Sequence, residues 1–120
     1  MKSVILDTNF ILSCVRKKID FFNEINFLGL KIIIPIQVIK ELENLTSKGK
    51  TKFRDEAKLS LALLKKNSFE KVDLQIKNVD NGIVKLAKER EDYIIATLDK
   101  EIQKKIKKVR RNGKLTTQNK

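Results

Sequence analysis

Four carboxylates occupy positions at which alternating α/β proteins commonly build their sites. Asp7 and Asp99 each follow a short apolar run that is typical of a buried strand. Glu41 lies within a stretch of helical periodicity, and Asp80 begins another such stretch. Carboxylate oxygens are the ligands that Mg²⁺ and Mn²⁺ prefer, and these cations can activate water and stabilise charge on a phosphoryl group. The four positions are therefore a candidate metal centre for phosphodiester chemistry.

A simpler structural role is open to three of these carboxylates. An aspartate between a strand and a helix often caps the helix by accepting a bond from a backbone N–H group. Asp7, Asp80 and Asp99 could each act as such a cap, and Asp73 is a nearby alternative to Asp80. Only their combination favours a shared site. Carboxylates that lie close together repel one another, so a group of them is expected where bound cations offset the repulsion.

Glu41 differs from the aspartates because it lies inside its predicted helix. The apolar residues Val38 and Leu42 belong to the buried face of this helix or to its border, so Glu41 is expected near the edge of that face. The alternative is an ordinary solvated glutamate. Glu43 is the nearest competitor, but two residues further on it points about 200° around the helix.

The predicted elements alternate between strands and helices, which indicates parallel strands joined by helical crossovers. Strands are expected at Lys2–Leu6, Lys31–Ile34, Phe69–Val72 and Tyr93–Thr97, with a last edge strand at Lys114–Gln118. Helices are expected after a cap at Thr8 or Asn9 to about Lys17, then over Asp20–Leu28, Ile36–Ser47, Lys52–Lys66, Asn78–Glu91 and Asp99–Val109. The fold class is α/β, a three-layer α/β/α sandwich around a mostly parallel sheet of four to five strands. Sites in such sheets form beyond the carboxyl ends of the strands, where Asp7 and Asp99 are expected.

Composition indicates one ordered domain over residues 1–120, with 41% hydrophobic residues, one proline and four glycines. Because the chain has no histidine and only Cys14, an internal disulfide, a Cys/His zinc site and any triad with a histidine base are excluded. No apolar run approaches the roughly 20 residues of a membrane span, and no secretory leader is evident. A cytoplasmic protein with no membrane partner is expected.

Charge points to a polyanionic partner. The chain holds 27 basic and 15 acidic residues, a net charge of +12, and residues 100–120 hold nine basic residues with Glu101 as the one acid. An excess of positive charge favours nucleic acid by neutralising phosphates and releasing counterions. A lysine-rich but merely solvated surface is the alternative.

The chain resembles the PIN-domain nucleases in four motifs that appear in the expected order and structural context. The motifs are Ile-Leu-Asp-Thr-Asn at 5–9, Pro-Ile-Gln-Val-Ile-Lys-Glu-Leu at 35–42, Asp-Asn-Gly-Ile-Val-Lys-Leu-Ala at 80–87 and Ala-Thr-Leu-Asp at 96–99. The resemblance extends over nearly the whole chain. It implies a PIN-like fold and an acidic quartet that holds one or two Mg²⁺ or Mn²⁺ ions, formed by Asp7, Glu41, Asp80 and Asp99.

The resemblance also assigns supporting roles. Asn9 and Thr97 would orient the carboxylates or the attacking water, while Leu98 departs from the polar residue that many relatives carry there. The implied reaction is metal-dependent hydrolysis of RNA by an endoribonuclease. Its RNA backbone would be held by the basic residues Lys104, Lys105, Lys107, Lys108, Arg110 and Arg111.

Within the family, the sequence from Tyr93 onward is most similar to archaeal PIN proteins related to the ribosome-biogenesis nucleases. This similarity favours rRNA processing and ribosome-assembly partners. A VapC-type toxin paired with an antitoxin shares the same four acids and stays open, as do a DNA-structure nuclease and a non-catalytic RNA-binding module. A homodimer through helices 36–47 and 52–66 is a further expectation.

Overall fold

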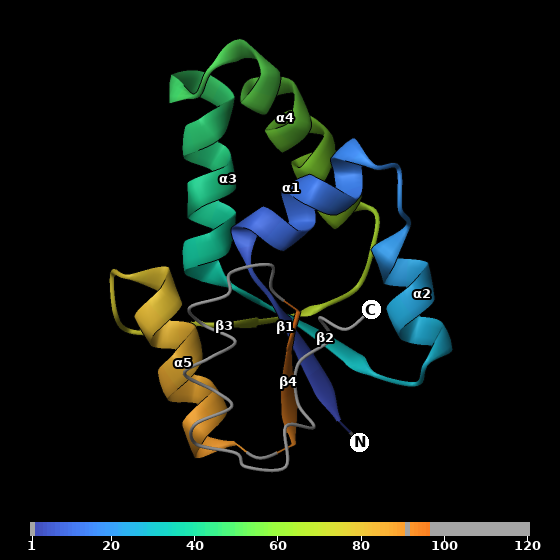
Figure 1. Ribbon diagram of the computed structural model, residues 1–120, viewed down its shortest axis with the longest axis vertical. Helices are drawn as coiled ribbons and strands as arrows, with labels where there is room; N and C mark the ends of the chain where they lie inside the picture. The colour runs from blue at the N-terminus through green and yellow to red at the C-terminus, as the bar shows by residue number, and fades with distance from the viewer. Residues whose placement is uncertain (1, 91, 97–120) are drawn as a thin grey trace.

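A computed structural model describes residues 2–90 and 92–96 of the chain (Figure 1). Its four strands all run parallel in the order β3-β2-β1-β4. The strands are β1 (Ser3–Leu6), β2 (Lys31–Pro35), β3 (Glu70–Val72) and β4 (Tyr93–Ala96). The helices of the described residues are α1 (Thr8–Arg16), α2 (Phe21–Phe27), α3 (Ile36–Lys48), α4 (Thr51–Lys65) and α5 (Val79–Glu89). The predicted α/β class with a parallel sheet is confirmed.

The central strands are buried on both faces, as their continuous apolar sequences predict. All four residues of β1 are buried, and β2 is buried throughout except at Lys31. Strand β1 lies between β2 and β4, with Ser3 opposite both Lys31 and Tyr93. A sheet that is covered on both sides needs helices on both faces, which makes this the expected three-layer arrangement.

The strand order fixes where the helices lie and where a site can form. Right-handed crossovers from β1 to β2 to β3 carry α1–α4 over one face, whereas the return from β3 to β4 carries α5 over the other. The chain thus leaves β1 in one direction and reaches its neighbour β4 from the opposite side. The crevice beyond the carboxyl ends of β1 and β4 is the topological switch point, where open parallel sheets bind ligands.

At two helix starts the structure selects one cap from several candidates in the sequence. Asp7, rather than Thr8 or Asn9, is the N-cap of α1, and Asn78, rather than Asp80, is the N-cap of α5. In both helices the capping side chain accepts from the N–H group three residues further along, as a cap requires. The predicted helix from Asp99 and the predicted edge strand at 114–118 lie outside the described residues.

An ion pair ties the helix that follows β1 to the helical hairpin of α3 and α4. The Arg16 guanidinium, at the end of α1, donates to both carboxylate oxygens of Glu56 on α4, at 2.8 and 2.9 Å. These bonds hold the pKa of the buried Glu56 carboxyl below its usual range. The forked contact fixes α1 relative to α4, which packs against α3, and residues of α3 share a pocket with the first turn of α1. No helix in the described part of the chain is long and apolar enough to cross a membrane.

Candidate active site

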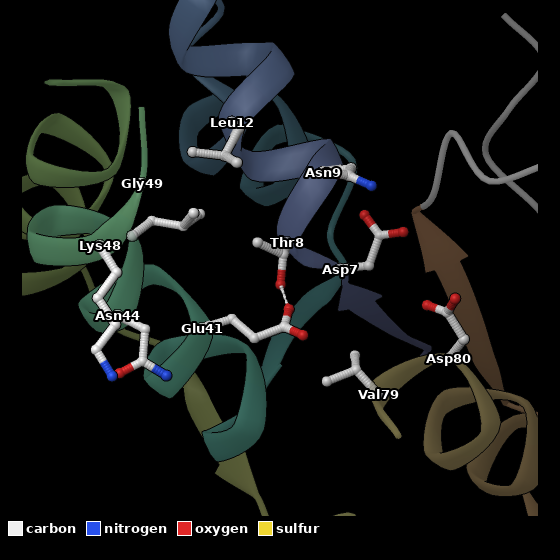
Figure 2. A pocket seen from close by; sticks show the side chains of 11 residues that line it. Asp7, Thr8, Asn9, Leu12, Glu41, Asn44, Lys48, Gly49, Val79 and Asp80 are labelled. Atoms are coloured by element: carbon white, nitrogen blue, oxygen red, sulfur yellow. Dashed lines mark hydrogen bonds between the residues drawn. The ribbon is translucent and has the colours of Figure 1, made fainter. Parts of the chain in front are cut away.

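A pocket of about 490 Å³ lies at the switch point, and three of the four predicted carboxylates line it. Asp7, Glu41 and Asp80 reach it from the N-cap of α1, from α3 and from the first turn of α5, respectively (Figure 2). Thr8 and Asn9 also line it. We call this cavity the acid pocket. Segments that are far apart in the sequence thus place carboxylates around one cavity.

Asp7 is placed by β1 and held by α1. Its backbone N–H group donates to the carbonyl of Ala96 on β4 at 3.4 Å, and its Oδ1 accepts from the N–H group of Phe10 at 2.7 Å. The residue is only 4% exposed. Capping and site lining are therefore not alternatives for Asp7, because one carboxylate oxygen accepts the cap bond at the wall of the pocket.

Glu41 is an exposed residue of α3 whose carboxylate is held by a neighbouring element. The Thr8 hydroxyl donates to Oε1 of Glu41, which joins the first residue of α1 to α3 (dashed line in Figure 2). Glu43 lines a different pocket, as its predicted direction around the helix requires. Although Glu41 is exposed, its side chain lines the acid pocket and is bonded to Thr8, so its role as a site residue stays a prediction with structural support.

Asp80 lies in the first turn of α5 and faces the pocket across from Glu41 (Figure 2). Because Asn78 supplies the cap, the capping role proposed for Asp80 is wrong. A carboxylate in the first turn of a helix is favoured by the partial positive charge of the N-terminal N–H groups. Asp73, the nearby alternative, is not among the residues that line the acid pocket.

The segment 73–78 before α5 is held against α3 by one side chain. Gln37 donates through Nε2 to Oδ1 of Asp73 at 2.7 Å and accepts at Oε1 from the N–H group of Leu74 at 3.1 Å. The bond from Gln37, together with one from the N–H group of Gln75, lowers the pKa of the Asp73 carboxyl. These contacts fix the chain that leads into α5, and so they help to position Asp80.

Gly82 lets α5 approach this segment closely. A Cβ atom at Gly82 would lie 2.8 Å from Cβ of Leu74, which is nearer than real Cβ contacts allow. We expect Gly82→Ala to lower the free energy of unfolding, because overpacking of about 1–3 kcal/mol outweighs a helix-propensity gain of about 1 kcal/mol. Asn81→Ala, at an exposed neighbouring position, is expected to raise it slightly. Urea unfolding measures whether the free energy of unfolding falls in Gly82→Ala and rises in Asn81→Ala. Stabilisation by Gly82→Ala would contradict the close packing.

The structure does not describe the remaining predicted site residues. Asp99, Thr97, Leu98 and the basic set at 104–111 lie outside the described residues, so their roles stay predictions from the sequence. Among residues 2–90 and 92–96, no three carboxylate, thiol or imidazole side chains are grouped closely enough to hold a metal ion directly. The three carboxylates share a cavity but do not form a closed coordination shell.

The chemistry of these donors nevertheless fits a hard divalent cation. The three carboxylates present only oxygen atoms, and Mg²⁺ commonly binds through one or two carboxylates while it keeps several waters. A softer metal is disfavoured, since burial raises the pKa of the only thiol, Cys14, to about 11 and keeps it protonated at neutral pH. Asp7, Glu41 and Asp80 are the described residues that could hold such a cation.

Three further polar residues of the acid pocket are not among the site residues that the sequence predicts. The sequence predicts Thr8 only as a cap and gives no role to Asn44 and Lys48. Asn44 and Lys48 follow Glu41 by three and seven residues, so they lie on the same face of α3 (Figure 2). That spacing was available in the sequence once Glu41 had been selected.

Comparison with known proteins agrees with this architecture. The model of the PIN-like domain family matches residues 4–112. The chain belongs to the PIN-like domain family. The solved structure of the PIN domain endonuclease Utp24 superimposes with a TM-score of 0.70 at 32% identity, covering 88% of this chain and 77% of that one. The predicted family is confirmed, and the four-stranded parallel sheet is the core of its PIN-like fold.

Two curated relatives extend the comparison. Ribonuclease VapC4 of Methanocaldococcus jannaschii is 35% identical over 109 residues, which cover 88% of this PIN-like chain and 83% of that protein. The rRNA-processing protein fcf1 of Schizosaccharomyces pombe is 29% identical over 108 residues, again 88% of this chain. The match covers 54% of fcf1, so this chain spans about half of that relative.

Proposed function

We propose that this PIN-like chain is a metal-dependent endoribonuclease in which residues 1–120 act as one nuclease domain. The observation that carries the proposal is the gathering of Asp7, Glu41 and Asp80 around one cavity at the topological switch point. The names of two relatives, a ribonuclease and an rRNA-processing protein, support RNA as the substrate. The net charge of +12 favours the same polyanion.

The protein's own residues would hold and orient the reacting groups. Asp7, Glu41 and Asp80 would hold Mg²⁺ or Mn²⁺, with Asp99 as the fourth acid that the sequence predicts. Such a cation, when bound, lowers the pKa of water and stabilises charge on the phosphoryl group. Thr8 fixes the carboxylate of Glu41 through its hydroxyl, and Asn9 lines the pocket beside Asp7.

The similarity to the rRNA-processing protein fcf1 supports rRNA processing as the biological role. The match to most of the length of VapC4 favours a toxin ribonuclease as the second candidate. Expression in a foreign host and depletion from its own host separate the two. Growth arrest on expression, relieved when a small protein that co-purifies from the native host is co-expressed, would support the toxin. Accumulation of unprocessed rRNA precursors on depletion would support the processing enzyme.

Cleavage assays test the proposed activity itself. Single-stranded RNA, structured RNA and DNA of the same sequence would each be incubated with the protein in Mn²⁺ and in EDTA. We expect cutting of RNA in Mn²⁺ and none in EDTA. Cleavage that persists in EDTA would contradict metal dependence, and binding without cutting would favour the non-catalytic module. Cutting of DNA alone would contradict the RNA substrate.

A further inference from the structure

A second pocket, of about 440 Å³, adjoins the acid pocket and shares three lining residues with it. The shared residues are Glu41, Asn44 and Val79. Beyond them the second pocket is lined by Gln37 and Lys40 of α3 and by residues 75–77 of the segment before α5. We call this second pocket the lysine subsite. The two cavities adjoin at these shared residues, along one face of α3, and we call them together the groove.

Charge reverses along this groove. The acid pocket contains three carboxylates and one lysine, Lys48, so its excess charge is negative. The residues that line the lysine subsite include Lys40 and Lys77 with only the shared Glu41 as an acid, so the lining itself carries an excess positive charge, although the nearby Asp73 carboxylate interacts with Lys40. The negative end favours cations and the positive end favours anions such as phosphate. A polyanion with regularly spaced phosphates is the kind of ligand that could use both ends at once.

The lysine subsite is formed by segments that are held together. Gln37 uses both ends of its amide group to hold Asp73 and Leu74, which fixes the segment that carries Lys77 next to α3. The N–H group of Gln75 donates to Oδ1 of Asp73 at 2.8 Å, which closes a tight turn with Gln75 at a φ of 60°. The half-buried Ile76 and buried Val79 add apolar surface on which a ribose or a base could rest.

We propose that the lysine subsite binds a phosphate of single-stranded RNA adjacent to the one that lies in the acid pocket. The inference rests on the proposed ribonuclease function, because it takes the acid pocket as the place of cleavage. Lys40 and Lys77 donate to phosphate oxygens and act as substrate-binding residues. Because phosphate contacts carry no sequence information, this binding orients the strand across the carboxylates without selecting bases.

Salt-dependent RNA binding tests the subsite separately from cleavage. The probe is a short fluorescein-labelled oligouridylate, titrated in EDTA with the full chain and followed by fluorescence anisotropy. The variant Lys40→Ala/Lys77→Ala removes both lysines of the subsite. The matched control is Lys31→Ala/Lys58→Ala, which removes the same charge from exposed positions at the amino end of β2 and on α4.

Loss of two phosphate contacts in Lys40→Ala/Lys77→Ala should make the negative slope of log K against log salt shallower by about 1.4 for a single strand. This change corresponds to roughly a twentyfold loss of RNA affinity near 0.1 M salt. The control is expected to keep the wild-type slope. Equal slopes in the two double variants would overturn the subsite, whether or not the protein cleaves RNA. Absence of cleavage by the wild-type protein, with the slope difference intact, would instead contradict the ribonuclease proposal while the subsite stands.

Cleavage kinetics provide a second readout. Because the subsite holds substrate away from the reacting phosphate, Lys40→Ala/Lys77→Ala is expected to raise KM about tenfold and to leave kcat near the wild-type value. The control pair should change neither constant. A fall in kcat with an unchanged KM would overturn the assignment, because it would place the two lysines in the chemical step.

Discussion

Replacing Asp7 by Asn is expected to lower the rate of RNA cleavage in Mn²⁺ by about a thousandfold. A cation at a reacting phosphate contributes several kcal/mol of charge stabilisation, and about 4 kcal/mol corresponds to that factor. Asn removes the negative charge but keeps an oxygen that can accept from the N–H group of Phe10, as Asp7 does. The loss of activity should therefore occur without loss of folding. Initial cleavage rates and urea unfolding measure the two effects.

Asp20 offers a closely matched control for this substitution. It is the N-cap of α2 and accepts from the N–H group of Asn23 at 3.2 Å, but it does not line the acid pocket. Asp20→Asn therefore makes the same chemical change at the same kind of helix position. We expect wild-type cleavage from this variant. Equal activity of Asp7→Asn and the wild-type protein would exclude Asp7 from the site.

Replacing Leu42 by Ala is expected to lower the free energy of unfolding by about 2–5 kcal/mol. Leu42 is 0% exposed and lies directly after Glu41 on α3, where it packs in the core. The loss is a large part of the roughly 5–15 kcal/mol that stabilises a typical domain. Chemical denaturation with circular dichroism measures it.

The control for Leu42 is a leucine of the same helical hairpin that does not pack in the core. Leu59 on α4 is 61% exposed, so Leu59→Ala should change the free energy of unfolding by no more than about 0.5 kcal/mol. Similar losses in the two variants would show that α3 does not pack as described. If Leu59→Ala alone were destabilising, the exposed side of α4 would be an interface, as the predicted homodimer requires.

Much of the site could be predicted because its position depends on sheet topology. Continuous apolar runs identified parallel strands, and parallel strands place the residues after their carboxyl ends at one edge. Asp7 lies at the carboxyl end of β1, as this topology requires whatever the strand order. Helical spacing gave Glu41 partial support, because a period of 3.6 residues separates its direction from that of Glu43, and the family resemblance then selected it.

The helix caps show where local sequence was insufficient. Asp7, Thr8 and Asn9 are all good capping residues, and so are Asn78 and Asp80, so composition cannot select among neighbours. The selection depends on where each chain segment turns away from its neighbours. In α5 the choice of Asn78 matters for function, because Asp80 then lies in the first turn with its carboxylate at the pocket.

The groove beside the carboxylates depends on contacts between elements that are far apart in the sequence, and such contacts cannot be predicted from the sequence alone. Gln37 and Asp73 are 36 residues apart, and their bond requires the packing of α3 beside the segment before α5. The contact between Thr8 and Glu41 likewise depends on the angle between α1 and α3. Spacing along one helix could have identified Asn44 and Lys48, but pairs between elements required the folded structure.

The most direct measurement is Mn²⁺ binding to the full chain, followed through the electron paramagnetic resonance signal of the free ion. Glu41→Gln and Glu43→Gln remove the same charge two residues apart on α3, but only Glu41 lines the acid pocket. We predict Mn²⁺ binding by the wild-type protein, a loss of affinity of about tenfold or more in Glu41→Gln, and wild-type affinity in Glu43→Gln. Absence of Mn²⁺ binding, or equal affinities in the two variants, would contradict a metal-dependent site at these carboxylates.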